Sequence, residues 1–156
     1  MRNSRLFSIL ISTLFVAISI IIGGRALTLP YTLNWKANNI HLNSFHTPEA
    51  WGVWTRGTQS TITFRSAFPK QVMVELHTKG FASNIGQPTK IICGDTTHNF
   101  ISTQESSVQR FQCTGMDQHP EITFQPSTSA SPKELGLSED NRQLGIAIEK
   151  ITISKA

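Results

Sequence analysis

Apolar and polar residues alternate with a period of two along several short stretches of the chain. In residues 60–65, Ile62 and Phe64 alternate with threonines and an arginine, and residues 71–78 repeat this pattern with valines and a leucine. A period of two is typical of a half-buried β-strand. Gly, Asp, Ser and Pro separate the later apolar runs. These runs predict further strands at 90–93, 99–103, 108–113 and 121–125.

The last strand is predicted over Leu144 to Ser154, but its apolar residues change parity within the strand. Leu144, Ile146 and Ile148 share one face, whereas Ile151 and Ile153 have the opposite parity. One extra residue in a strand, a β-bulge, restores a common face. We therefore predict a bulge near Glu149 and Lys150.

The remaining segments after residue 26 carry weaker signals. Residues 26–33 read as a tether or a first edge strand, because Pro30 has no backbone N–H to donate to a central ladder. Residues 35–45 are expected to form a loop or a short strand. No stretch shows a sustained helical period, although 131–137 is long enough for one helical turn. The loop at 126–132 is too short to separate domains.

Seven or eight short strands, spaced about ten residues apart and separated by turns, predict an all-β fold. We expect an antiparallel β-sandwich of jelly-roll type, similar to carbohydrate-binding modules. The chain of 156 residues accommodates one such domain, at 27–156, after an N-terminal segment at 1–26. About 130 residues are sufficient to bury a core of this kind.

The N-terminal segment has the pattern of a membrane anchor or an export signal. Arg2 and Arg5 precede an uncharged, mostly apolar run at 6–24, which is close to the roughly 20 residues that cross a bilayer as a helix. We favour an uncleaved, single-pass transmembrane helix in the inner membrane of a Gram-negative cell, with the domain in the periplasm. Cleavage after Ala26, which would release a periplasmic protein, is the alternative, and Arg25 makes that site a poor one.

The net charge of +4 does not indicate a nucleic-acid binder. Three arginines flank the apolar run, and removing them from the 14 basic residues leaves eleven against ten acidic ones. The chain after the run is therefore nearly neutral, and its lysines and arginines are spread along the sequence. Nucleic-acid binding depends on a clustered basic face. We expect no nucleic-acid partner.

Cys93 and Cys113 are the two cysteines of the chain. An even number in an exported chain favours a disulfide, which would close a loop of about 20 residues. Cys93 shares a strand face with Ile91, and Cys113 shares one with Phe111, so both sulfurs are expected to point to the apolar side. A metal site is the alternative, although neither cysteine has a CxxC partner.

Residues 47–64 contain the densest group of candidate functional side chains. Trp51 and Trp54 together can form a platform for a sugar ring, with Glu49 and Arg56 placed to bind hydroxyl groups. The other interpretation, which the sequence favours, is that both tryptophans close one end of the sandwich core, as large aromatic residues often do. In an extended segment, Trp51 and Trp54 face opposite ways unless a turn intervenes.

Asp140 and Arg142 precede the last strand and form a second candidate group, together with Glu139. Either they fix the loop by hydrogen bonds, which we favour, or they coordinate a ligand or Ca²⁺. We predict specifically that Arg142 pairs with Glu49, which would join the two segments.

Nothing in the sequence assembles a catalytic site. The five histidines lack HxH and HExxH spacing, and neither a GxSxG nucleophile elbow nor a glycine-rich phosphate loop occurs. We expect no metal, no cofactor and no enzymatic activity of the domain itself.

Two motifs in the right order resemble a known family. They are PExWGxWT at 48–55 and SPKELG at 131–136, the latter followed by Asp140, Arg142 and residues 144–146. Together they are similar to the C-terminal β-domain, of unknown function, of bacterial membrane-bound phosphoglycerol transferases that act on osmoregulated periplasmic glucans. The similarity extends over residues 40–154. Those enzymes perform their chemistry in a separate sulfatase-like domain, which this chain lacks, so the resemblance implies signature residues rather than catalytic ones.

The sequence thus predicts a non-catalytic envelope module that binds glycan or docks beside a glycan-modifying enzyme of this type. A structural or protein-interaction subunit of an envelope complex, without affinity for glycan, is the alternative. The residues expected to contact a glycan are Glu49, Trp51, Trp54, Arg56, Asp140 and Arg142.

Overall fold

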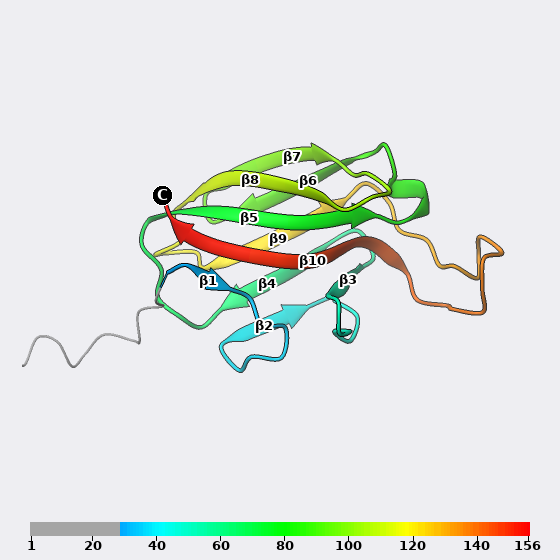
Figure 1. The fold of residues 1–156 in the computed structure, drawn as a ribbon, viewed down its shortest axis with the longest axis horizontal. Coiled ribbons are helices and arrows are strands. Elements are labelled where there is room, and N and C mark those ends of the chain that lie inside the picture. The colour runs from blue at the N-terminus through cyan, green and yellow to red at the C-terminus, as the bar shows by residue number, and fades with distance from the viewer. Residues whose placement is uncertain (1–28) are drawn as a thin grey trace, which may run out of the picture.

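Two antiparallel β-sheets pack face to face in the computed structural model, which describes residues 29–156 (Figure 1). Strand order in the first sheet is β1-β10-β5-β8, and β3 pairs with β10 on the same edge as β1. Its strands are β1 (Tyr31–Thr32), β3 (Val53–Arg56), β5 (Gln71–Gly80), β8 (Ser107–Thr114) and β10 (Leu144–Lys155).

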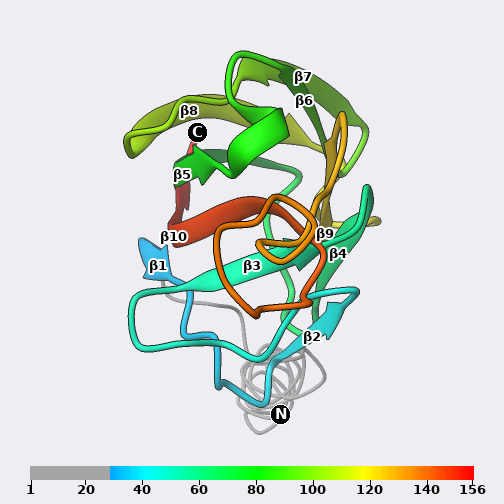
Figure 2. The same cartoon turned by 90° about the vertical axis from the view of Figure 1, so that its right-hand side faces the viewer.

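The second sheet has the strand order β2-β4-β9-β6-β7, and all its pairs are antiparallel. Its strands are β2 (Ile40–Asn43), β4 (Ser60–Phe64), β6 (Pro88–Cys93), β7 (Thr96–Ile101) and β9 (Glu121–Pro126). One short 3-10 helix, η1 (Ala82–Asn84), follows β5. Viewed from the end, the two sheets form separate layers, and the long loop before β10 lies over β3 (Figure 2).

The predicted all-β, antiparallel sandwich is therefore confirmed. Strands occur at every position where the alternating pattern predicted one, and β1 is the expected edge strand. Residues 29–156 contain ten strands rather than seven or eight, because residues 35–45 form a short strand, β2, and β3 is an additional edge strand. β3 was not predicted as a strand of its own, since its inward residues are only Val53 and the polar Thr55.

The core lies between the sheets and is formed by the inward residues of both. Ile146, Ile148, Ile151 and Ile153 of β10 are all fully buried, although their parity changes within the strand. The register between β10 and β5 shifts between Ile148 and Lys150, which confirms the predicted bulge. The bulge turns both halves of β10 toward one core.

A disulfide joins Cys93 and Cys113, as predicted. Cys93 lies in β6 and Cys113 in β8, so the bond links the two facing sheets. Both residues are completely buried among the apolar side chains of the core. The metal alternative for these two cysteines is wrong.

The predicted membrane segment at 6–24, and with it the whole N-terminal segment at 1–26, lies outside the described residues. Within residues 29–156, no helix is both long and apolar enough to span a bilayer.

Candidate functional site

Trp51 lies at the tip of a hairpin formed by residues 44–56. Its two arms are joined by a bridge between Phe45 and Thr55, and a tight turn closes it where the Glu49 N–H donates to the Gly52 carbonyl oxygen at 2.8 Å. This turn separates Trp51 from Trp54, so the parity of an extended strand does not apply. The hairpin brings both indoles to one face.

Gly52 allows this hairpin to lie directly on the bulge of β10. Its φ of 154° is a backbone conformation that residues with a side chain rarely adopt. A Cβ at this position would clash with the Ile148 carbonyl oxygen and would lie 2.9 Å from Cα of Glu149. The glycine of the WGxW motif is therefore required by a close approach of two backbone segments.

The aromatic rings form a row on the outer face of the first sheet. The Trp51 and Trp54 ring centroids are 5.6 Å apart, those of Trp54 and Phe81 are 5.7 Å apart, and both pairs meet edge to face. Trp54 and Lys79 are both in register with Ala147, so the three side chains share this outer face. Ala147 is completely buried there although it faces outward.

The two tryptophans differ in exposure. Trp51 is 39% exposed, whereas Trp54 is half-buried between Trp51 and Phe81. Neither indole belongs to the buried core between the sheets. The favoured prediction that both close one end of the core is therefore wrong, because the hairpin turn places them on the outer face of the sheet.

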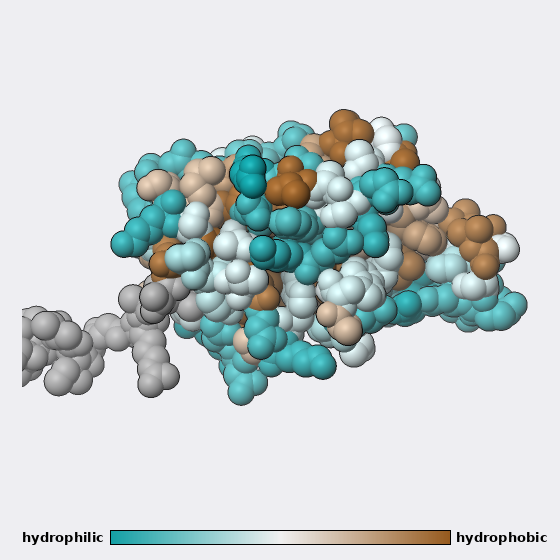
Figure 3. All heavy atoms as spheres, viewed as in Figure 1, coloured by the Kyte–Doolittle hydropathy of each residue, from teal (hydrophilic) through white to brown (hydrophobic). Residues whose placement is uncertain are grey.

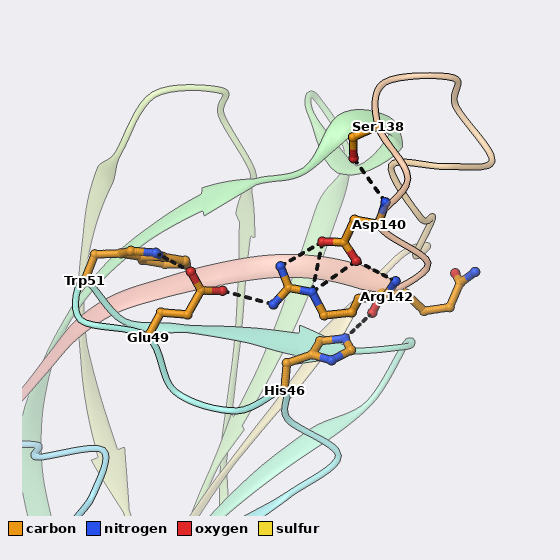
Figure 4. A network of polar contacts seen from close by, with 7 residues as sticks. His46, Glu49, Trp51, Ser138, Asp140 and Arg142 are labelled. Atoms are coloured by element: carbon orange, nitrogen blue, oxygen red, sulfur yellow. Dashed lines mark hydrogen bonds and ion pairs between the residues drawn. The ribbon is translucent and has the colours of Figure 1, made fainter.

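Arg142 lies between two carboxylates, as Figure 4 shows. Its Nη1 donates to Glu49 Oε1 at 3.0 Å, and its Nη2 donates to Asp140 Oδ2 at 2.8 Å. Trp51 Nε1 donates to the other Glu49 oxygen at 2.9 Å. The predicted pair of Arg142 and Glu49 is thus confirmed, and Asp140 has the favoured structural role of fixing the loop.

The loop at 127–143 is fixed by its own hydrogen bonds. Ser131 and Glu134 form a reciprocal capping box, with N–O distances of 2.9 and 3.1 Å. The Leu137 N–H donates to the Pro132 carbonyl at 2.8 Å, so 131–137 forms the predicted single turn without becoming a regular helix. The SPKELG motif is therefore a loop-folding device.

Side-chain contacts attach this loop to the sandwich. Gln143 donates to the carboxylate of Glu134 at 2.9 Å, and the Gln143 carbonyl lies 2.9 Å from Nε2 of His46 on the hairpin. Together with the bonds of Arg142, these contacts hold the loop against the hairpin. Residues of the two motifs, almost 100 positions apart in sequence, thus form one connected network.

The network holds its carboxylates in the ionised form. The Arg142 guanidinium, together with the indole N–H of Trp51, lowers the pKa of Glu49. Arg142 also lowers the pKa of Asp140, through its side chain and its backbone N–H, and both carboxylates raise the pKa of Arg142. Beyond this network, hydrogen bonds from Ser106 and Lys79 lower the pKa of Glu149.

We expect the fluorescence of Trp51 to report the protonation of Glu49. Because the pKa of Glu49 is lowered in the folded state, the contact with Trp51 is retained as the pH falls from 8 to about 5. It is lost only when the pH falls through the lowered pKa, below the ordinary value of 4.5. The measurement is tryptophan emission against pH. Glu49→Gln is the control, which should remove this transition, and a transition at or above pH 4.5 would contradict the assignment.

Three residues near the indoles were not found by sequence reasoning. Lys79 Nζ lies 5.4 Å from the Trp51 ring centroid and 3.1 Å from the Glu149 carboxylate, and Phe81 packs against Trp54. The only feature of the sequence that indicates the position of Lys79 is the alternation of β5, which places its side chain on the outer face. Glu149 is the bulge residue. The register between β3, β10 and β5 brings these residues to the hairpin.

Arg56 shares the outer face of β3 with Trp54 and is exposed. The other predicted site residues are connected to one another through Arg142, Glu49 and Trp51, and Arg56 takes no part in these contacts. Within the described residues of the chain, no group of three or more His, Cys, Asp or Glu side chains is arranged to hold a metal ion. The site consists of an exposed aromatic ring and charged groups that are paired with one another.

The fold and this site define an antiparallel β-sandwich domain with an aromatic surface beside a fixed ion network. Comparison with known families places the chain more specifically. Residues 30–155 match the family described as "Domain of unknown function (DUF7024)", and the chain belongs to this family. The match includes both motifs and all the predicted site residues.

The other comparisons add little. No curated protein matches the chain. A solved structure named "BiXyn10A CBM1 APO" is similar to it, with 10% sequence identity and a TM-score of 0.46, and the alignment covers 83% of this chain and 100% of that one. The similarity to phosphoglycerol transferases remains a prediction from the two motifs.

Proposed function

We propose that this domain is a non-catalytic module that binds a glycan on the outer face of its first sheet. The observation that supports this proposal is the exposed indole of Trp51, which Trp54 holds at one edge and the Glu49 carboxylate holds at its N–H. An exposed tryptophan with both supports is positioned before any ligand arrives. A ring fixed in this way loses little conformational entropy on binding.

The groups around Trp51 match the chemistry of a sugar. The C–H groups of a pyranose face pack on an aromatic ring, and its hydroxyl groups need donors and acceptors at the rim. Each Glu49 oxygen accepts one bond from the protein. A carboxylate has about four acceptor positions in total, so two remain for sugar hydroxyls. Arg142 is the donor beside this carboxylate, and Lys79 is a donor beside the Trp51 ring.

The charge states support a binding role rather than glycoside hydrolysis. A general acid of a glycosidase needs a carboxyl group whose pKa is raised, so that it carries a proton near neutral pH. Glu49, Asp140 and Glu149 all have lowered pKa values. We therefore propose that the module supplies no catalytic residue and that any chemistry on the glycan belongs to a partner enzyme of the phosphoglycerol transferase type.

We also propose that the sandwich is a jelly roll. In that fold, eight strands form two four-stranded sheets through two Greek keys. The orders β3-β10-β5-β8 and β4-β9-β6-β7 follow this scheme, with β1 and β2 as added edge strands.

We propose that residues 6–24 form an inner-membrane anchor and that the domain lies in the periplasm. Tyr31 pairs with Ile153 near the end of β10, whereas Trp54 pairs with Ala147. Six residues of a strand separate these positions by about 20 Å. The chain therefore enters β1 about 20 Å along β10 from Trp54, whereas Glu49 and Ala50 of the hairpin tip share a hollow with Thr32 of β1.

A protein-interaction module is the second candidate. Leu135 and Leu137 are 44% and 66% exposed on the loop at 127–143. Figure 1 places this loop at the right of the molecule, and Figure 3 shows apolar surface at that end. The capping box keeps this tip ordered, which is a property of a docking surface as well as of a loop that frames a ligand site.

Replacing Trp51 with alanine is expected to weaken glycan binding at least tenfold, since the main contact surface is removed, and to change the free energy of unfolding by less than about 1 kcal/mol. Isothermal titration of the purified full-length protein with periplasmic glucans measures the first, and urea unfolding measures the second.

Ile101→Ala is the matched control, because Ile101 is an exposed apolar residue, 56% accessible, in the second sheet. It should leave binding unchanged. If the wild-type protein shows no heat and no thermal stabilisation with any glucan at millimolar concentration, the glycan proposal is rejected. A Leu137→Asp variant that loses a partner protein would then favour the protein-interaction module.

A further inference from the structure

The first sheet is incomplete at one edge, next to the hairpin tip. β1 and β3 pair with the same edge of β10 and lie end to end along it, while β5 occupies the other edge (Figure 1). The Leu33 N–H still bonds to the Ile151 carbonyl, and Val53 is the partner of Ile148. Only Glu149 and Lys150 of β10 therefore lie between these two contacts, whose β10 residues are three positions, or about 10 Å, apart.

A hollow of about 450 Å³ opens in this region of the surface. Thr32 lines it from the end of β1, and Trp35 and Lys36 line it from the segment that follows β1. Glu49 and Ala50 line it from the hairpin tip. Trp35 is half-buried and packs on the core, so its position is fixed. The Lys36 N–H bonds to the Asn34 side chain at 3.0 Å, which orders the turn that carries both residues.

The hollow and the Trp51 surface are adjacent. Ala50 lines the hollow and is the residue directly before Trp51, so their Cα atoms are about 3.8 Å apart. Glu49 belongs to both places, because it lines the hollow and its carboxylate accepts the Trp51 N–H. Trp35 thus lines a hollow whose lining also includes Glu49 and Ala50, the two residues that precede Trp51.

We infer that the hollow beside Trp35 is a second subsite for the glycan that Trp51 binds, and that the ligand is an uncharged oligosaccharide long enough to cross the hairpin tip. This inference rests on the proposed glycan-binding function and extends it. One sugar unit packs against Trp51, the ligand passes the Glu49 carboxylate, and the following units enter the hollow next to Trp35.

The charges around both indoles support an uncharged ligand. Three acidic residues, Glu49, Asp140 and Glu149, face three basic ones. Arg142 is paired with the first two and Lys79 with the third, and Lys36 lines the hollow. These six groups sum to no net charge, so the ion pairs and the hollow give neither a polyanion nor a polycation a net attraction. Hydroxyl groups, which both donate and accept, match such a mixed rim.

The test is a length series titrated into the full-length protein by calorimetry. The probes are uncharged β-linked gluco-oligosaccharides of one to six units with 1→2, 1→3 and 1→4 linkages. If two subsites act together, the affinity of the preferred linkage should rise by about tenfold between the shortest ligand that binds and the longer ones, because a second aromatic contact is added.

Two variants assign this rise to the hollow. Ala50→Gln fills it from the exposed hairpin turn, and Trp35→Phe shortens its aromatic wall while keeping an apolar ring against the core. Both should abolish the gain for longer ligands and leave the affinity of the shortest ligand within about twofold. Asn38→Gln, an exposed turn residue outside the hollow, is the control and should change nothing.

The outcomes of the length series test the second subsite separately from the Trp51 site. If short and long oligosaccharides bind wild-type protein equally, the second subsite is rejected while the Trp51 site stands. A length effect that Ala50→Gln and Trp35→Phe both leave intact also rejects it. If no oligosaccharide binds at all, both proposals fail. Tighter binding of phosphate-substituted or uronic-acid ligands than of uncharged ones would overturn the ligand class.

Discussion

Replacing Gly52 with alanine is expected to lower the free energy of unfolding by about 4 kcal/mol. The φ of 154° strains any residue with a Cβ, at a cost of about 1–3 kcal/mol. The new methyl group would also meet the backbone of Ile148 and Glu149, which cannot rotate away as a flexible side chain does. Overpacking of this kind costs a further ~1–3 kcal/mol.

Urea denaturation of wild type and variant measures this difference, and Gly57→Ala provides the matched control. Gly57 also has a positive φ, of 72°, but nothing lies within 4 Å of a Cβ added there. The control should therefore lose only the backbone contribution, about 1–2 kcal/mol. Equal losses in the two variants would show that contact between hairpin and bulge has no energetic effect.

Gly52→Ala should also weaken glycan binding, because relief of the clash would move the hairpin tip away from β10. The indole of Trp51 and the Glu49 carboxylate move with that tip. Gly57→Ala lies at the other end of β3 and should retain wild-type affinity. Titration of both variants with the same glucan separates the effect on the site from the effect on stability.

Replacing Cys93 and Cys113 together with alanine is expected to cost about 3–5 kcal/mol. The disulfide closes a loop across a sequence separation of 20 residues, and its removal restores conformational entropy to the unfolded chain worth about 3 kcal/mol in the chain-entropy model. Both side chains are completely buried, so the lost sulfur atoms leave unfilled space in the core as well. The bond also joins the two sheets directly.

Urea unfolding with and without a reducing agent tests this expectation. Wild-type protein should lose most of the difference when it is unfolded under reducing conditions, whereas the double variant should be insensitive to the reductant. A variant as stable as the oxidised wild type would contradict the stabilising role of the bond. Each curve should be fitted with its own slope, because the bond restricts the unfolded state and so changes the surface exposed on unfolding.

The local pattern of the sequence was sufficient for most of the fold. Alternation at 60–65 and 71–78 predicted β4 and β5, and the parity change in 144–154 predicted the bulge in β10. These features depend on which side chains face water, and the period of the strand encodes this directly. β3 was not predicted, because its two inward residues are too few to form a recognisable period.

The candidate site was only partly predictable. The two motifs pointed to the right segments, and the predicted contact between Arg142 and Glu49, which joins these segments, is present. The exposure of Trp51 was not predictable from the sequence, because it depends on the turn between Glu49 and Gly52. This turn interrupts the strand, so the alternation of inward and outward residues in β3 does not extend back to Trp51. Lys79, Phe81 and the hollow beside Trp35 come together only through the pairing of strands distant in sequence.

The sequence by itself thus determined most of the strands and their inward faces, the disulfide partners and the two segments that meet at the site. Each of these depends on local periodicity or on the identity of a few residues. The tertiary structure alone decided which face carries the indoles, and that β1 and β3 leave a gap at the edge of β10. The physical reason is that strand register is a non-local property, because it depends on how the buried faces of both sheets fit together, and a surface site inherits its geometry from that fit.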